Sequence, residues 1–90
     1  MLKIWKSSNG LIMGWFSDKT ENQKCRDEIE KAWNKEFPKE KGYCFPIVLP
    51  GMPPMQSLQA ERVDYLISKG YKTITDKDMK TLITNYKTGI

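Results

Sequence analysis

The chain has 90 residues, of which 39% are hydrophobic and 29% are charged, and its formal net charge is +4. This length predicts a single small domain over residues 1–90, and no apolar run approaches the roughly 18 residues that a membrane span needs. The absence of histidine excludes Ser-His and Cys-His catalysis and removes the commonest zinc ligand.

Residues 2–16 have the pattern of a β-hairpin. Residues 2–6 alternate between apolar and polar apart from Trp5, and residues 11–16 form a mostly apolar returning strand. Asn9-Gly10 between them predicts a type I′ turn. Gly14 indicates a bulge or the close approach of another element. Trp5 is out of phase with its neighbours, so we expect it on the outer face of the sheet.

Residues 20–37 carry the strongest helix signal of the chain. Thr20 followed by Gln23 predicts a capping box at the helix start, and Pro38 ends the helix. Five apolar residues recur at helical spacing and are expected to face the core: Cys25, Ile29, Ala32, Trp33 and Phe37.

Residues 43–49 predict a third strand because they are rich in aromatic and β-branched residues. Pro46 cannot donate to a ladder, so this strand should lie at an edge or carry a bulge. The loop that follows, residues 50–55, combines three prolines with Met52 and Met55. It has two interpretations: a stiff path that exposes the methionines to a partner, or a lid that folds them over the core.

Two further helices, over residues 57–69 and 76–87, are predicted near the end of the chain. Gly70 suits a left-handed cap for the first helix, residues 71–74 are extended, and Thr75 caps the second helix. The element order ββαβαα predicts an α+β fold in which helices pack on an antiparallel three-stranded sheet. The expected core consists of Leu2, Ile4, Ile12, Ile29, Trp33, Phe45, Ile47, Leu66, Leu82 and Ile83.

Few residues have the spacing of a catalytic or cofactor site. Asp76, Asp78 and Lys80 form a D-x-D-x-K string, as in metal-dependent nucleases, but acids at a helix start suit the helix dipole and favour a capping role. The glycines form no phosphate-binding loop. Cys25 and Cys44 are too few for a structural zinc site and are predicted to be free thiols in the cytoplasm. The sequence therefore predicts no enzyme, no cofactor and no metal.

A nucleic-acid-binding module that uses the last helix is one of two functional hypotheses. Its basic face, with Thr84 and Asn85 as base readers, could follow a phosphate backbone. Basic residues are spread over both halves of the chain, however, and only Arg26 and Arg62 are arginines, the residue that reads phosphate and guanine best. The candidate contacts are Lys69, Lys72, Lys77, Lys80 and Lys87.

The preferred hypothesis is a small non-catalytic protein that acts by stoichiometric contact with a protein partner, as an inhibitor or regulator. Its candidate contacts are Leu49, Met52 and Met55, with Trp5 as a neighbour, because methionines and exposed aromatics suit protein-binding surfaces. A short, lysine-rich, histidine-free chain resembles in composition the small accessory proteins of phages and mobile elements, and this likeness assigns no residue a role. Self-association through an open sheet edge is a third hypothesis.

Overall fold

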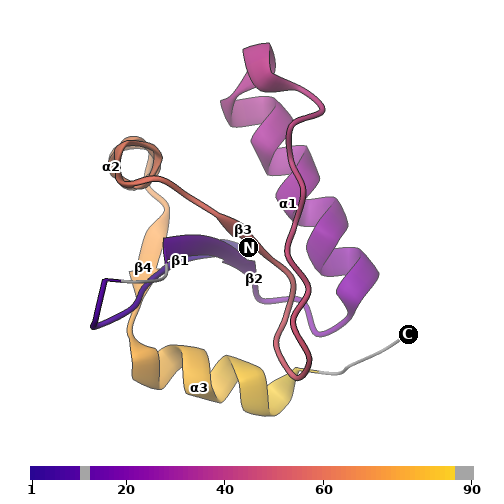
Figure 1. Cartoon of the computed structure of the whole chain (residues 1–90), viewed down its shortest axis with the longest axis vertical. Coiled ribbons are helices and arrows are strands. Elements are labelled where there is room, and N and C mark those ends of the chain that lie inside the picture. Colours follow the sequence, from indigo (N-terminus) through magenta and orange to yellow (C-terminus); the bar gives the residue numbers. More distant parts are fainter. Residues whose placement is uncertain (11–12, 87–90) are drawn as a thin grey trace.

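The computed structural model describes residues 1–10 and 13–86, and within them three α-helices and four strands form a small α+β fold (Figure 1). The order ββαβαα is roughly matched, with one additional strand before the last helix. The elements are β1 (Leu2–Lys6), β2 (Met13–Ser17), α1 (Asn22–Glu36), the short 3₁₀ helix η1 (Pro38–Glu40), β3 (Met55–Ser57), α2 (Ala60–Ser68), β4 (Lys72–Ile74) and α3 (Asp76–Asn85).

The sheet is mixed and four-stranded, in the order β3-β2-β1-β4. The pairs β1–β2 and β2–β3 are antiparallel, whereas β4 runs parallel to β1 with Ile4 opposite Thr73. The predicted three-stranded antiparallel sheet is therefore wrong. The extended residues before α3 add a parallel edge strand, and the third strand consists of residues 55–57 instead of 43–49.

The predicted hairpin is confirmed in its pairing and corrected in its turn. Leu2 lies opposite Ser17 and Lys6 opposite Met13. Gly10 has a φ of +72° and its N–H donates to the Ser7 carbonyl at 2.9 Å. The φ of Asn9 is not positive, which excludes a type I′ turn. The predicted core residue Ile12 lies outside the described residues.

Gly14 allows β3 to approach β2 closely. A Cβ at this position would lie 3.0 Å from the Gln56 carbonyl oxygen and 3.4 Å from the Met55 sulfur. The ladder between β1 and β2 is regular at Gly14. The close approach of a neighbouring element, rather than a bulge, explains this glycine.

Both faces of the hairpin are covered by helices (Figure 1). Trp15 and Phe16 point to opposite faces, and neither is exposed. The first core packs between the sheet, α1 and α2, and the second between the sheet and α3. The first core contains Leu2, Ile4, Trp15, Ile29, Trp33, Leu58, Val63 and Leu66, and the second contains Phe16, Met55 and Met79, with Trp5, Met52, Ile74, Leu82 and Ile83 packed against them.

The apolar face of α1 is confirmed, but its predicted start is not. Cys25, Ile29 and Trp33 are buried, and Ala32 and Phe37 pack against the first core. The helix begins at Asn22 with Glu21 as its N-cap, and no side chain caps it. Gln23 does not reach back to the helix start, because its amide donates to Asp27 Oδ1 at 2.9 Å.

Arg62 of α2 packs against the C-terminal end of α1. Its guanidinium lies 4.5 Å from the centre of the Phe37 ring and 5.0 Å from that of Trp33, and it forms an ion pair with Glu40. Trp33 Nε1 donates to the Glu40 carbonyl at 3.1 Å. These contacts combine cation–π attraction with hydrogen bonds at the join between α1, η1 and α2.

The end of α2 and the start of α3, on either side of β4, have the predicted caps. Gly70 has a φ of +101° and the Tyr71 N–H donates to the Leu66 carbonyl at 3.2 Å, which closes α2. Thr75 and Asp78 form a capping box at the start of α3. Because β4 separates them, α2 and α3 lie on opposite faces of the sheet and do not form a helix-turn-helix-like pair.

Replacing Trp33 by Ala should lower the free energy of unfolding by about 3 to 5 kcal/mol, because the side chain is buried among Trp15, Phe37 and Arg62. Phe45 is 72% exposed, so Phe45→Ala should change stability by less than about 0.5 kcal/mol. Urea unfolding of both variants measures the two values. Equal losses would contradict the described cores.

Candidate functional site

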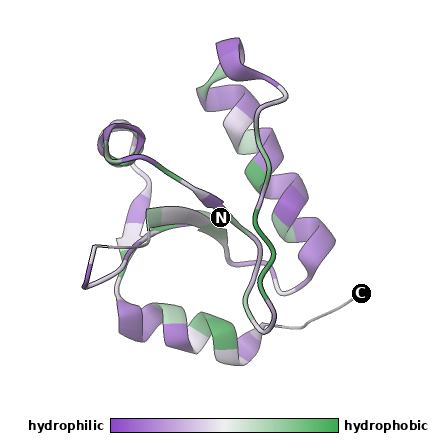
Figure 2. Ribbon diagram, in the orientation of Figure 1, coloured by the Kyte–Doolittle hydropathy of each residue, from purple (hydrophilic) through white to green (hydrophobic). Residues whose placement is uncertain are grey.

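Large apolar side chains gather at the surface along the segment between η1 and β3. We call residues 43–49 the exposed strip: Tyr43 is 68% and Phe45 72% exposed, and Ile47, Val48 and Leu49 are each at least 40% exposed. Figure 2 shows the hydrophobic character of this segment beside α1. Contiguous exposed apolar surface is uncommon on small proteins that act alone.

The exposed strip lies beside the sheet edge without becoming a strand. Ile47 and Met55 exchange two backbone hydrogen bonds, of 2.7 and 3.0 Å. Next to them the Gln56 side chain takes the place of further pairing, because its Oε1 accepts from the Phe45 N–H at 3.0 Å and its Nε2 donates to the Ser57 carbonyl at 3.2 Å. The predicted strand 43–49 is therefore wrong, and so is the predicted burial of Phe45 and Ile47.

No charged residue occurs in residues 42–60, although 29% of the chain is charged. Basic residues stand at the beginning of the exposed strip. Lys39 and Lys41 precede it, and no salt bridge joins either to an acid among the described residues, whereas Glu40 between them is paired with Arg62.

The four predicted partner contacts occupy different environments. Leu49 is exposed and belongs to the strip, and Met52 is half-buried against the second core. Met55 is only 8% exposed and packs in that core, so of the two interpretations of the loop the exposed path does not describe Met55. The lid interpretation of the loop describes Met55 correctly, because α3 and the sheet leave a space that methionine fills.

Trp5 is also engaged inside the fold and does not stand on an open sheet face. Its ring packs edge-on against Phe16 with centroids 5.6 Å apart, and its Nε1 donates to Asp76 Oδ1 at 2.7 Å. The face that the sequence suggested to be outer is covered by α3. Sequence reasoning thus missed four strip residues, Tyr43, Phe45, Ile47 and Val48, whose signal was the uncharged run around them.

One hollow joins the strip to two helix ends. It has a volume of about 260 Å³ and brings Leu49 and Met52 together with Asn22 at the start of α1 and Tyr86 after α3. Asn22 Oδ1 and Tyr86 Oη are shielded from solvent and have no hydrogen-bond partner in the part of the chain that the structure describes. We call this space the anchor hollow.

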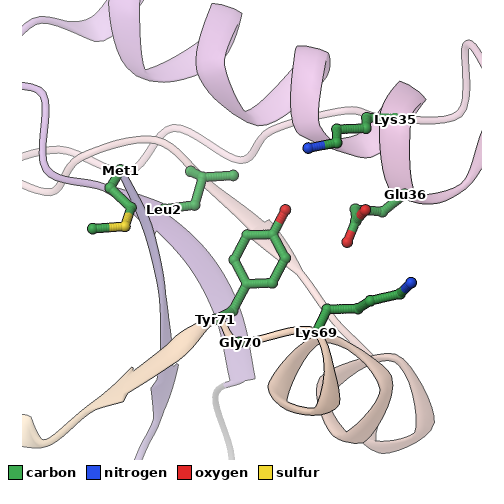
Figure 3. A pocket seen from close by; sticks show the side chains of 7 residues that line it. All are labelled: Met1, Leu2, Lys35, Glu36, Lys69, Gly70 and Tyr71. Carbon is green, nitrogen blue, oxygen red and sulfur yellow. The ribbon is translucent and has the colours of Figure 1, made fainter.

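A second hollow of about 410 Å³ lies around Tyr71, where its hydroxyl points between Lys35 and Glu36 (Figure 3). Burial raises the pKa of Tyr71, and the negative charge of Glu36 raises it further. Lys69 lines the same hollow, so its walls carry both signs of charge. This arrangement selects neither anions nor cations.

The predicted basic contacts are spread over two helices and a strand. Lys69 ends α2 with its Nζ 5.6 Å from the centre of the Tyr65 ring, and Lys77 and Lys80 are exposed on α3. Lys72 on β4 lines a hollow of about 370 Å³ together with Lys3, Thr73, Thr81 and Asn85. Lys87 lies outside the described residues.

Asp76 and Asp78 are both engaged in structural contacts. Asp76 accepts hydrogen bonds from Ser8 and from Trp5, and these bonds lower its pKa. Asp78 completes the capping box with Thr75. Among residues 1–10 and 13–86, no three Cys, Asp or Glu side chains come together as metal ligands.

No protein-family model matches the chain, and no curated protein or solved structure is significantly similar to it. In the described ranges, every helix is too short or too polar to cross a membrane.

Both thiols should react slowly with iodoacetamide in the folded protein. Burial raises the pKa of Cys25, and it raises the pKa of Cys44 to about 11, with a contribution from Glu30. Because only the thiolate reacts, alkylation of Cys44 at neutral pH should be about a hundredfold slower than in the unfolded chain and should accelerate as the pH rises toward 11. Mass spectrometry of native and denatured samples measures both rates, and rapid native labelling would contradict the described burial.

Proposed function

We propose that this protein is a non-catalytic binding protein that contacts a protein partner stoichiometrically, as an inhibitor or regulator, through the exposed strip. The observation that supports it best is the exposure of five large apolar side chains on one uncharged segment: Tyr43, Phe45, Ile47, Val48 and Leu49. Aromatic and aliphatic side chains of this kind form the centres of protein interfaces.

The exposed strip is better suited to binding than to folding. Its backbone is held at Phe45 and Ile47, so the segment is already ordered and binding need not order it. Its side chains contribute little to either core, and exposed aromatics lower solubility. A partner that covers them would remove that apolar area from water.

A non-catalytic role agrees with the chemistry that the chain offers. There is no histidine, Asp76 and Asp78 are held in structural hydrogen bonds, and both cysteine thiols have raised pKa values. The free thiols suit the reducing cytoplasm, where we place the interaction.

A photo-crosslinking amino acid at position 45 should form one dominant covalent adduct with a partner in the cells that produce the protein. The same amino acid at Thr84, on the exposed surface of α3, should form no such adduct and serves as the matched control. Mass spectrometry identifies the adduct.

With the partner identified, Phe45→Ser and Leu49→Ser should each weaken its binding more than tenfold, or about 1.4 kcal/mol. Their unfolding midpoints should stay close to that of the unaltered protein. Met55→Ser should instead destabilise the protein, because Met55 is buried. Adducts from position 84 but not from position 45 would overturn the proposed function.

Nucleic-acid binding is a second candidate, supported by the hollow beside α3 that Lys3 and Lys72 line, together with Asp78. It predicts retention on DNA at low salt that falls steeply as salt rises, because bound lysines release counterions. The triple variant Lys72→Glu, Lys77→Glu, Lys80→Glu should abolish retention without changing the circular dichroism spectrum. If the unaltered protein passes through the column at low salt, this candidate is excluded.

A further inference from the structure

The anchor hollow is the size of a side chain rather than of a cofactor. Its volume of about 260 Å³ lies below the range of about 300–1,000 Å³ that small-molecule sites occupy. It opens beside Val48 and Leu49, where the exposed strip ends, and Pro50, Gly51 and Met52 continue its wall together with Asn22 and Tyr86. An elongated occupant of the strip would therefore reach the hollow with one of its side chains.

The polar atoms at the hollow suit a polypeptide better than a hydrocarbon. Asn22 Oδ1 and Tyr86 Oη lack partners within the described residues, and buried polar atoms without partners are rare. Both residues line the hollow and are only half-buried overall, so small side-chain movements can turn these oxygens toward an occupant. A polypeptide supplies N–H donors beside its apolar side chains.

Positive charge stands at both ends of this surface. Lys39 and Lys41 are exposed at the beginning of the strip, and Arg26 follows Asn22 by four residues in α1, so it shares a helix face with this wall of the hollow. Burial raises the pKa of Tyr86, and the positive charge of Arg26 opposes that rise. No salt bridge neutralises Arg26 among the described residues.

These charges favour acidic groups on the occupant, one near each end. Seven extended residues span about 20 Å, because a strand rises about 3.3 Å per residue. Between the two ends the strip itself is uncharged, and the charge of Glu30 in α1 contributes to the raised pKa of Cys44. A second copy of the chain docked strip to strip would bring basic ends together, which disfavours self-association here.

We propose that the exposed strip and the anchor hollow receive a linear segment of the partner protein, with one apolar side chain in the hollow, an apolar centre along the strip, and Asp or Glu residues near both ends. This inference rests on the proposed function and deepens it by naming the chemistry of the bound segment. Polar contacts to Asn22 and Tyr86 fix the position of the inserted side chain.

The test uses the full chain and a displayed library of random peptides about 12 residues long, enough to span the strip when extended. Selection should enrich peptides with an apolar centre and acidic residues toward both ends. The enriched peptides are then synthesised, and fluorescence anisotropy gives their Kd at an ionic strength of about 0.15 M, where remote charges are screened.

Two sets of variants test the two halves of the inference. Charge reversal at the ends (Arg26→Glu, Lys39→Glu, Lys41→Glu) should raise the Kd of the acidic peptides at least tenfold. The same variant should bind more tightly to versions of these peptides that carry lysine at the ends. Reversal of three lysines elsewhere (Lys72→Glu, Lys77→Glu, Lys80→Glu) carries the same change in net charge and should alter Kd less than twofold.

Tyr86→Phe removes a hydroxyl that has no partner among residues 1–10 and 13–86. It should leave the melting temperature unchanged or raise it. The Kd of the peptides should nevertheless rise about fivefold, because the bound peptide gives the hydroxyl a hydrogen-bond partner. A purely structural role for Tyr86 would lower the melting temperature instead. An unchanged Kd would show that the hollow is not occupied.

Other outcomes overturn the inference without deciding the proposed function. Enriched peptides that lack acidic ends, or a selection that yields no peptide sensitive to Leu49→Ser, would exclude the linear acidic segment. A dimer in sedimentation that Leu49→Ser dissociates would show a second copy as the occupant. The crosslink from position 45 still decides independently whether a partner protein contacts the strip.

Discussion

Burial of the central hairpin on both faces is the constraint on which the rest of the fold depends. Trp15 and Phe16 are adjacent in β2, point to opposite faces and are both fully buried. A chain of 90 residues must therefore supply two apolar covers from a limited stock of hydrophobic residues. Helices α1 and α2 cover one face, whereas α3 covers the other only with the help of the loop that carries Met52 and Met55.

The way this loop is used explains why the strip before it stays outside. The loop turns inward to bring Met55 onto Phe16 and Met79, and β3 then pairs with β2 through residues 55–57. The place beside β2 is thus filled by β3, so residues 43–49 are left at its outer side. There the Gln56 amide satisfies backbone groups that a fully paired strand would otherwise satisfy, and the strip keeps a defined path with its side chains in water.

Local signals in the sequence predicted most of the helices and the hairpin, and failed where distant segments meet. The stripe of Cys25, Ile29 and Trp33 and the cap at Thr75 depend on neighbouring residues, and both are found. The three residues of β4 have no apolar alternation of their own and pair with β1 almost 70 positions earlier. In the same way, the segment around Phe45 has the composition of a buried strand. The strand that begins at Met55 takes the place at the sheet edge instead, and Phe45 stays exposed.

The two halves of the uncharged run, residues 42–60, therefore lie in different environments. Its second half, from Pro53 to Leu58, is mostly inside, whereas its first half forms the exposed strip. Positive charge near an apolar surface opposes self-association, and Lys39, Lys41 and Arg26 carry such charge near the strip and on the α1 face that bears Asn22. In the complex proposed above, the same three residues would select against a basic segment, so one set of charges would oppose self-association and set the specificity for the bound segment.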